Sequence, residues 1–339
     1  MHSHRSTSQP TVAVVGGESL LGKEVRELLE SSDLGANIKL VAADEEDASI
    51  ITRGEDEPLL ISSLAAADLG EARIAILAGS RESSRKAYER IRKASPAPVV
   101  IDVSGGLEDR PETRLRAPMV EPPGHRVSSA VQEIAHPAAI ALALFLTQLQ
   151  KAGTVRRAVV NIFEPVSERG QAGIDELQKQ TVGLLSFKPL AKDVFDTQVS
   201  FNMLPQYGSD SQHSLGEIEL KIDRHLASLL AGAGSVPMPS LRVFHAPVFH
   251  GYSMSVWVEF ENNLDVEAIE RALESSHIDV RGKEHEPPSN VGVAGQGGIT
   301  VGAIAPDRNQ PRACWFWMVA DNLRIAAENA TEVARELLK

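Results

Sequence analysis

The first hundred residues alternate between short apolar runs and segments in which apolar residues recur every three or four positions. Residues 11–17 (TVAVVGG) form the first run, and residues 18–32 follow with helical periodicity. Further apolar runs occupy residues 38–44, 72–79 and 97–105. Such runs are typical of strands buried on both faces. Their alternation with helices predicts an α/β fold with a parallel sheet of Rossmann type.

The turn after the first strand has a glycine spacing typical of phosphate binding. Gly16 and Gly22 keep the outer positions of a G-x-x-G-x-x-G pattern, and Ser19 stands at the middle one. Glycines let backbone N–H groups approach a pyrophosphate at the helix N-terminus. We expect a nucleotide-type fold, with an ordinary strand–helix turn as the alternative. The expected cofactor-binding residues of this turn are Gly16, Gly17, Ser19, Leu20, Leu21 and Gly22.

Four consecutive acids, DEED at residues 44–47, follow the second apolar run. Asp44 and Glu45 can hydrogen-bond the adenosine ribose of NAD, whereas they would repel the 2′-phosphate of NADP. The alternative is a solvated loop, because charge runs usually lie on the surface. If a dinucleotide binds, the sequence favours NAD over NADP.

Composition narrows the class of protein. With 339 residues the chain is long enough for two domains. The net charge of -12 and the absence of a Lys/Arg run argue against nucleic acid as a partner. The longest apolar stretch, residues 138–146, is too short for a membrane span. Residues 1–10 lack the apolar core of a signal peptide and predict a disordered tail. We therefore expect a cytoplasmic protein.

The second half carries more distinctive strings. They are VVNIFEPVSERGQAGIDELQKQT (159–181), SFNMLPQ (200–206), HAPVFHGYSMSVWVEFE (245–261) and FWMVADNLRIAAENATEVARELL (316–338). In this order, after a glycine-rich Rossmann turn, they resemble the aspartate-semialdehyde dehydrogenase family. The resemblance implies a Rossmann domain at 11–134 completed by 319–339, and an α+β catalytic domain with a mixed sheet at 135–318. It also implies a homodimer.

The resemblance implies a reductive dephosphorylation of an acyl phosphate through a cysteine thiolate, with NADP as the cofactor. In this chain Ala139 falls at the place of that cysteine, in a helix for which Pro137 suits the first turn. The family's glutamine becomes Glu164, its substrate arginine becomes His245, and its proton-shuttling histidine becomes Tyr252. The covalent route is therefore not expected.

Other positions of the family pattern are changed or kept. Its anion-binding arginine falls on Glu108, and its lysine falls on Glu219 or, with a slip, on Lys221. His250 lies between His245 and Tyr252 in the sequence, so we expect it near the same pocket. Glu45 falls at the position where the family has an arginine that holds the NADP phosphate. Cofactor-side residues that remain are Ala78, Gly79, Ser80 and Asn322. Asn322 has an alternative role as a helix cap.

The only cysteine, Cys314, lies in an alternating strand pattern (ACWFWMV), so we interpret it as a packing residue rather than the missing nucleophile. A single cysteine also excludes an internal disulfide. Several histidines lie in polar stretches and are expected at the surface: His213, His225, His277 and His285.

Three functions stay open. The chain is similar to the cysteine-less Usg-type relatives of the dehydrogenase, which favours an inactive, homodimeric nucleotide-binding or regulatory homologue. A different enzyme could use the Glu/His/Tyr pocket for acid–base chemistry, although no spacing indicates a metal site. The third possibility is an NAD(P)-dependent dehydrogenase of amino-acid biosynthesis.

Overall fold

A computed structural model of the protein describes residues 9–43, 50–53, 58–232, 234 and 236–339. The chain divides into two compact units. The first comprises Met1–Pro118, Pro122–Ile134 and Ala326–Lys339, and the second comprises Met119–Glu121 and Ala135–Ile325. Most of the expected N-terminal tail, residues 1–8, lies outside the described residues.

The first unit contains a six-stranded sheet in which every neighbouring pair is parallel, in the order β2-β1-β5-β6-β8-β7. Its strands are β1 (Thr11–Val15), β2 (Asn37–Val41), β5 (Ala72–Leu77), β6 (Val99–Asp102), β7 (Thr113–Arg116) and β8 (Val131–Ile134). Helices α1 (Leu20–Ser31) and α2 (Arg81–Ile91) follow β1 and β5. Strands β3 (Ile50–Arg53) and β4 (Pro58–Ile61) form a separate antiparallel pair. The predicted Rossmann-type sheet is confirmed.

The C-terminal residues are tied to the first unit by charged side chains. Arg116 is almost wholly buried and donates to Glu336 at 2.7 Å, and Arg73 donates to the carbonyl of Leu337 at 2.6 Å. These partners lie at the end of helix α7 (Asn322–Leu338). A cation at a helix C-terminus also complements the helix dipole. The end of α7 is thus an integral part of the first unit.

The second unit is built on a mixed six-stranded sheet with the order β10-β9-β11-β14-β13-β12. Its strands are β9 (Val155–Glu164), β10 (Ser240–His245), β11 (Tyr252–Phe260), β12 (Ile278–Arg281), β13 (Ile299–Pro306) and β14 (Ala313–Ala320). Its helices are α3 (Pro137–Leu149), α4 (Gly170–Leu185), α5 (Leu215–Ala231) and α6 (Val266–Leu273), with a 3-10 turn, η1 (Val166–Arg169), before α4. The pairs β10·β9 and β12·β13 are parallel and the other pairs are antiparallel.

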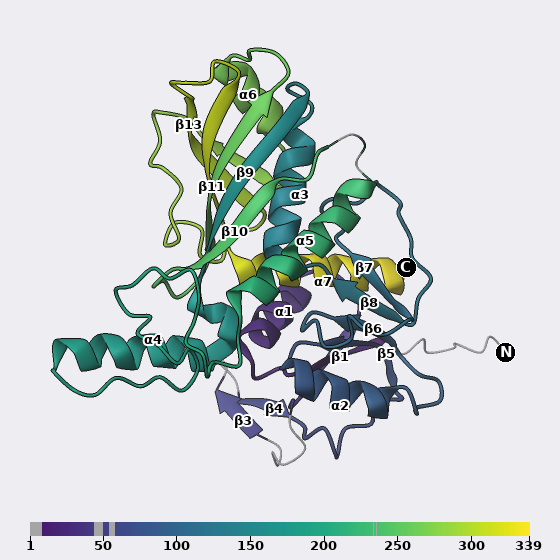
Figure 1. Ribbon diagram of the computed structural model, residues 1–339. Coiled ribbons are helices and arrows are strands. Elements are labelled where there is room, and N and C mark those ends of the chain that lie inside the picture. Colours follow the sequence, from purple (N-terminus) through teal and green to yellow (C-terminus); the bar gives the residue numbers. More distant parts are fainter. Residues whose placement is uncertain (1–8, 44–49, 54–57, 233, 235) are drawn as a thin grey trace. The chain divides into compact units, whose positions relative to one another are not determined.

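One face of this mixed sheet is covered by helices. α3 contacts β9, α5 and α6, α5 contacts β10, and α6 contacts β12 and β13. Helix α3 is apolar nearly all round, and most of its residues are buried, as expected for a helix enclosed on every side. Figure 1 shows α3, α5 and α6 beside the strands. This packing forms the core of the second unit.

The opposite face of the mixed sheet is open and aromatic. The register places Val159 beside Trp257 and Trp257 beside Trp315, while Phe163 and Trp317 are also partly exposed. Asp307 accepts hydrogen bonds from the indoles of Trp257 and Trp315, each at 2.8 Å, and the Trp317 indole donates to the Pro288 carbonyl at 3.0 Å. All three tryptophans of the chain therefore lie on this face, which we call the aromatic face.

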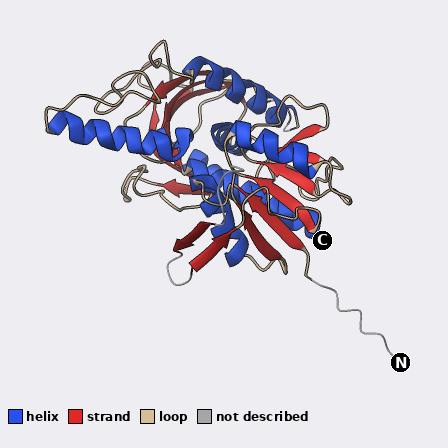
Figure 2. Ribbon diagram, turned by 90° about the horizontal axis from the view of Figure 1, so that it is seen from below, coloured by secondary structure: helices blue, strands red, loops and turns tan. Residues whose placement is uncertain are grey.

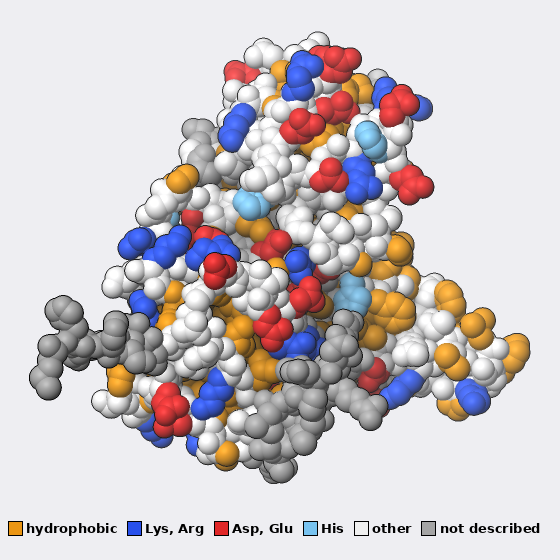
Figure 3. All heavy atoms as spheres, turned by 180° about the vertical axis from the view of Figure 1, so that it is seen from behind, with side chains coloured by type: hydrophobic (Ala, Val, Ile, Leu, Met, Phe, Trp, Pro, Cys, Tyr) orange, Lys and Arg blue, Asp and Glu red, His pale blue; other side chains and the backbone are white. Residues whose placement is uncertain are grey.

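Helix α4 extends away from the mixed sheet in both ribbon views (Figure 1 and Figure 2). Its exposed apolar residues include Val182 and Leu185, and the exposed Phe187 follows the helix. Figure 3 shows hydrophobic side chains along this protruding helix. Its buried side hydrogen-bonds the following loop, because Gln180 accepts from the N–H groups of Val199 and Ser200.

Other local predictions also hold. The helix expected to start at Pro137 does so, with His136 as its N-cap, and Cys314 lies in strand β14. None of the helices in the described part of the chain has both the length and the apolar character of a membrane span.

Candidate functional site

The first candidate site is the glycine-rich turn of the first unit, where β1 and β5 end side by side. Gly16 has φ +86°, and a Cβ on it would lie 2.5 Å from the backbone nitrogen of Gly79. A Cβ on Gly22 would lie 2.0 Å from the Gly16 carbonyl oxygen. Only glycine fits these two positions, since any side chain would meet backbone. The turn is therefore as tight as phosphate-binding turns require.

Ser19 caps α1 and leaves the start of the helix able to bind an anion. Its Oγ accepts from the Gly22 N–H at 2.8 Å and donates to the Ala78 carbonyl at 2.7 Å. The N–H groups of Leu20 and Leu21 belong to the first helical turn, where no carbonyl of the same helix can accept them. Such N–H groups and the helix dipole together favour a phosphate.

The strand order also places this turn where ligands commonly bind, because the order of the strands reverses at β1. The chain runs from β1 to β2 on one side, whereas β5 and β6 lie on the other side of β1. In open parallel sheets, ligands bind at the carboxyl ends of the strands where the order reverses. Ser80, which caps α2 by accepting from the Ser83 N–H at 3.1 Å, stands at the same end of β5.

Sequence reasoning missed an acid inside this turn. The Glu18 carboxylate accepts from the Ala43 N–H at 2.9 Å, just beyond β2. The sequence did contain a signal for this residue, because Glu18 is a carboxylate placed inside the glycine-rich turn, between Gly17 and Ser19. Asp44 and Glu45, on which the NAD prediction depended, lie outside the described residues.

In the second unit, the start of α3 carries no nucleophile. Ala139 lies in the first turn of the helix and is fully buried. Cys314 is buried in β14, and burial, together with the charge of Asp307, raises its thiol pKa. A thiol that resists ionisation is a poor nucleophile. The interpretation of Cys314 as a packing residue agrees with its burial.

The second candidate site is a buried cluster around Glu164, at the end of β9. Arg169 Nη2 donates to both Glu164 carboxylate oxygens, at 3.0 and 2.9 Å, and the Tyr207 hydroxyl donates at 3.0 Å. Burial raises the Glu164 pKa to about 7, against the opposing effect of the Arg169 charge. Neither Arg169 nor Tyr207 was singled out from the sequence. We call Glu164, Glu168, Arg169, Tyr207, His245 and Tyr252 the carboxylate cluster.

Glu168 supplies a second carboxylate to this cluster. It accepts from Asn322 Nδ2 at 2.8 Å, and Asn322 Oδ1 in turn accepts from the Gly251 N–H at 3.0 Å. Burial raises the Glu168 pKa, while the charges of Arg169 and Lys221 lower it. The side chain of Asn322, a predicted cofactor contact, is thus engaged by protein groups. Asp321, rather than Asn322, caps α7, because it accepts from the N–H groups of Leu323 and Arg324.

His245 and Tyr252 complete the carboxylate cluster. His245 pairs with Glu164 in the β9–β10 register, and its ring lies 5.7 Å from those of Phe195 and Tyr207. Burial lowers the His245 pKa to about 4, so the imidazole is neutral at pH 7. Tyr252 is fully buried, and burial followed by the charge of Glu168 raises its pKa well above the usual value.

Several expected pocket residues have other partners. Glu219 accepts from Arg242 and from the Val243 N–H, at 3.1 and 3.0 Å. Glu108 belongs to the first unit and pairs with Arg81. His250 is only partly buried. Of the expected pocket residues, the second unit brings Glu164, His245 and Tyr252 together. The surface expectation for His225 was wrong, because it is buried and its Nδ1 accepts from the His136 N–H.

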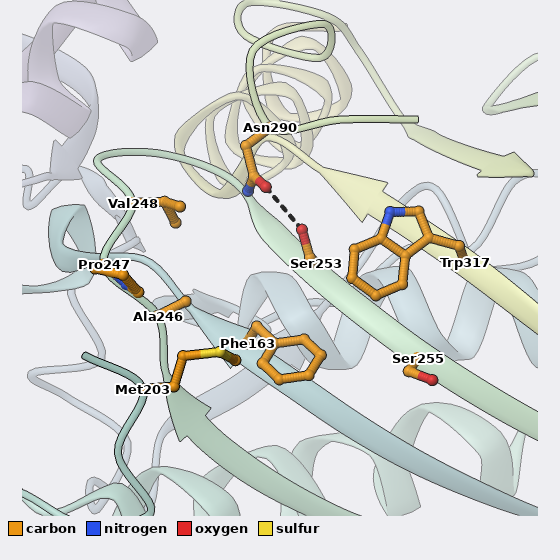
Figure 4. A pocket seen from close by; sticks show the side chains of 9 residues that line it. All are labelled: Phe163, Met203, Ala246, Pro247, Val248, Ser253, Ser255, Asn290 and Trp317. Carbon is orange, nitrogen blue, oxygen red and sulfur yellow. Dashed lines mark hydrogen bonds between the residues drawn. The ribbon is translucent and has the colours of Figure 1, made fainter. Parts of the chain in front are cut away.

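A pocket of about 430 Å³ opens on the aromatic face. Figure 4 shows the rings of Phe163 and Trp317 on the strands and Met203 on a neighbouring loop, with Ser253 hydrogen-bonded to Asn290. The lining is mostly apolar, so the pocket suits an apolar side chain better than a charged metabolite.

Known proteins resemble the whole chain. Residues 146–325 match the family described as "Semialdehyde dehydrogenase, dimerisation domain". An aspartate-semialdehyde dehydrogenase of Rickettsia bellii is 30% identical, covering 98% of this chain and 99% of its own. A USG-1 protein homolog of Pseudomonas aeruginosa is 31% identical with the same coverage. The solved structure of a probable aspartate-semialdehyde dehydrogenase from Pseudomonas aeruginosa has a TM-score of 0.85 at 27% identity, covering 98% and 99% of the two chains.

Proposed function

Because the chain belongs to the semialdehyde dehydrogenase family, we propose that it is a member without dehydrogenase activity, acting in the cytoplasm as a homodimeric nucleotide-binding or regulatory protein. The observation that carries this proposal is Ala139, a methyl group where the resemblance requires a thiolate. Cys314 does not replace it, because it is buried and its pKa is raised. Covalent catalysis needs an ionisable nucleophile.

The carboxylate cluster supports the proposal. Glu164 already accepts three hydrogen bonds from Arg169 and Tyr207, so its oxygens are engaged by the protein itself. The one cation of the cluster, the Arg169 guanidinium, is already paired with Glu164. A substrate carrying a carboxylate and a phosphate would have to compete with Glu164 for it, and a unit-charge pair near 4 Å is worth about 4 kcal/mol at an effective dielectric of 20.

An acid–base enzyme is the second candidate. One observation favours it: a carboxyl with a pKa of about 7 is suited to proton transfer at neutral pH. The engagement of Glu164 by Arg169 and Tyr207 argues against it, because a reacting group must displace one of them. We therefore favour the inactive homologue.

The glycine-rich turn supports retention of a dinucleotide, which we propose to be NAD rather than NADP. The N–H groups at the start of α1 would hold its pyrophosphate, with Gly16 and Gly22 giving the backbone its close approach. A nicotinamide cofactor supplies hydride chemistry in dehydrogenases. In this chain we propose that its role is regulatory.

Two measurements on the purified protein test the proposed function. Phosphate-dependent oxidation of aspartate semialdehyde, assayed with NAD and with NADP, is expected to stay at the level of the no-enzyme control. Calorimetric titration is expected to detect NAD binding. Turnover that disappears after thiol modification would overturn the proposal, as would the absence of binding by either dinucleotide.

We propose that the aromatic face joins two copies of the chain. It lies within the matched dimerisation domain, and it exposes 42% of Trp315 and of Val159. A contiguous exposed apolar face of this kind is typical of an interaction site. The pocket of Figure 4 would then receive an apolar side chain of the second copy.

Trp315→Glu is expected to convert the dimer into a monomer at micromolar concentration, because it puts a charge on the exposed aromatic face that we propose as the contact. Light scattering after gel filtration measures the mass. Leu220→Glu is the matched control, since Leu220 is 60% exposed on α5, a helix on the covered side of the sheet. A Trp315→Glu protein that remains dimeric, or a native protein that is monomeric, contradicts this assignment.

A further inference from the structure

We propose that Glu18 selects a ribose 2′-hydroxyl over a 2′-phosphate on the adenosine of a bound dinucleotide. The inference rests on the proposed nucleotide-binding role and names the residue that gives that site its specificity. Such selection in Rossmann folds is attributed to an acid at the carboxyl end of the second strand. Glu18 instead comes from the turn after the first strand.

Hydrogen bonds fix the Glu18 carboxylate at that strand end. The N–H groups of Gly16 and Gly17 both donate to the carbonyl of Val41, the last residue of β2, at 2.8 and 3.2 Å. Glu18 Oε1 accepts from the Ala43 N–H, two residues further along. Although Glu18 belongs to the turn after β1, its carboxylate therefore lies at the end of β2.

The second carboxylate oxygen of Glu18, Oε2, can accept a hydrogen bond from a ligand. Glu18 Oε2 is buried and has no hydrogen-bond partner in the described part of the chain. A buried acceptor without a donor costs free energy, which a donating hydroxyl group recovers. A ribose 2′-hydroxyl is such a donor, and ribose hydroxyls bind acids at the corresponding place in NAD-dependent folds.

The charge of Glu18 acts against a phosphate. Within the described ranges, no lysine or arginine forms an ion pair with Glu18. A 2′-phosphate has no hydrogen to donate when fully ionised, and it would lie beside a carboxylate of the same sign. Glu18 thus favours the hydroxyl twice, by accepting its hydrogen bond and by repelling the phosphate.

The experiment uses ligands that differ only at the 2′ position. NAD is compared with NADP, and AMP is compared with adenosine 2′,5′-bisphosphate, by calorimetry on the full-length protein. The two adenosine fragments report on the adenosine half alone, whatever happens to the nicotinamide. Native protein is expected to bind the 2′-hydroxyl member of each pair at least about tenfold more tightly.

Two variants remove the selection in graded steps. Glu18→Gln keeps an oxygen for the Ala43 N–H but loses the charge, and it is expected to reduce the preference to less than about threefold. Glu18→Arg is expected to reverse it. Asp44→Asn/Glu45→Gln tests the alternative that the acids of the DEED run make this selection, and our proposal predicts that this variant keeps the native preference. Thermal unfolding followed by circular dichroism verifies that each variant is folded.

The outcomes separate the inference from the proposed function. If native protein prefers the 2′-hydroxyl ligands but only the Asp44→Asn/Glu45→Gln protein loses that preference, the role of Glu18 is refuted while nucleotide binding stands. A native preference for the 2′-phosphate ligands also refutes it alone. Binding of none of the four ligands overturns both.

Discussion

Replacing Arg169 with methionine is expected to lower the free energy of unfolding of the second unit by about 3–5 kcal/mol at pH 8. Methionine fills much of the space of the arginine stem but leaves the buried Glu164 carboxylate without its cation. Arg169 is only 9% exposed and Glu164 is fully buried, so water cannot replace the lost partner. Urea unfolding followed by tryptophan fluorescence reports on this unit, because it holds all three tryptophans.

The loss is expected to depend on pH. The Glu164 pKa is raised from 4.5 to about 7 in the folded protein, so the folded state binds a proton that the unfolded state releases above pH 4.5. The stabilising contribution of that proton is fully present below pH 4.5 and is lost as the pH rises through 7. Without Arg169 the pKa rises further, so the Arg169→Met penalty should be smallest near pH 5 and largest at pH 8.

A double variant makes this test independent of whether Arg169→Met folds. Glu164→Gln/Arg169→Met removes the unpaired carboxylate together with its cation, and it is expected to recover most of the lost stability at pH 8. Tyr207→Phe is the matched control, since it removes one hydrogen bond from Glu164 without changing the charge. A penalty that is equal at pH 5 and pH 8, or a double variant no better than the single one, would contradict the ion-pair account.

Gly22→Ala is expected to abolish nucleotide binding and to destabilise the first unit by about 3 kcal/mol. The added methyl group would lie 2.0 Å from the Gly16 carbonyl oxygen and 2.9 Å from the Gly17 Cα, and backbone cannot move aside as a side chain can. Alanine is favoured over glycine in a helix by about 1 kcal/mol, which offsets only part of this strain. Calorimetry measures binding, and hydrogen exchange of the β1 amides measures stability.

Gly17→Ala, in the same turn, is the control. Its methyl group would meet the Leu40 side chain at 3.3 Å, a contact that a small side-chain shift relieves. We expect binding to be retained and the loss of stability to stay below about 1 kcal/mol. Equal effects of the two substitutions would show that the close approach of Gly22 to Gly16 is not what shapes the turn.

The fold was predictable because its signals are local. Residues 11–17 form an apolar run that ends in glycine, and residues 137–149 form an apolar helix that starts with proline; both became the expected elements. The short strand β7 was missed, because its sequence TRLR is polar and has no apolar run. Its place at the sheet edge relies on pairing with β8.

The carboxylate cluster was only partly predictable. Glu164, His245 and Tyr252 could be named from their places in the family strings. Tyr207 reaches Glu164 from 43 residues away, and no periodicity indicates such a pair. Glu219 was expected in the pocket, but its carboxylate binds Arg242 and the Val243 N–H of the neighbouring strand. Which side chains meet is decided by tertiary packing, which residue spacing does not encode.

The hydrogen bonds of the three indoles limit how the aromatic face can recognise another molecule. Asp307 takes the donors of Trp257 and Trp315, and the Pro288 carbonyl takes that of Trp317. The rings can therefore offer a partner contact area but no free N–H group to be matched. Discrimination between a correct and an incorrect partner must come from the outline of the surface and from charges at its border, such as Arg157 and Arg242. The tryptophans thus contribute affinity through apolar contact area, and the charges at the border of the face contribute specificity.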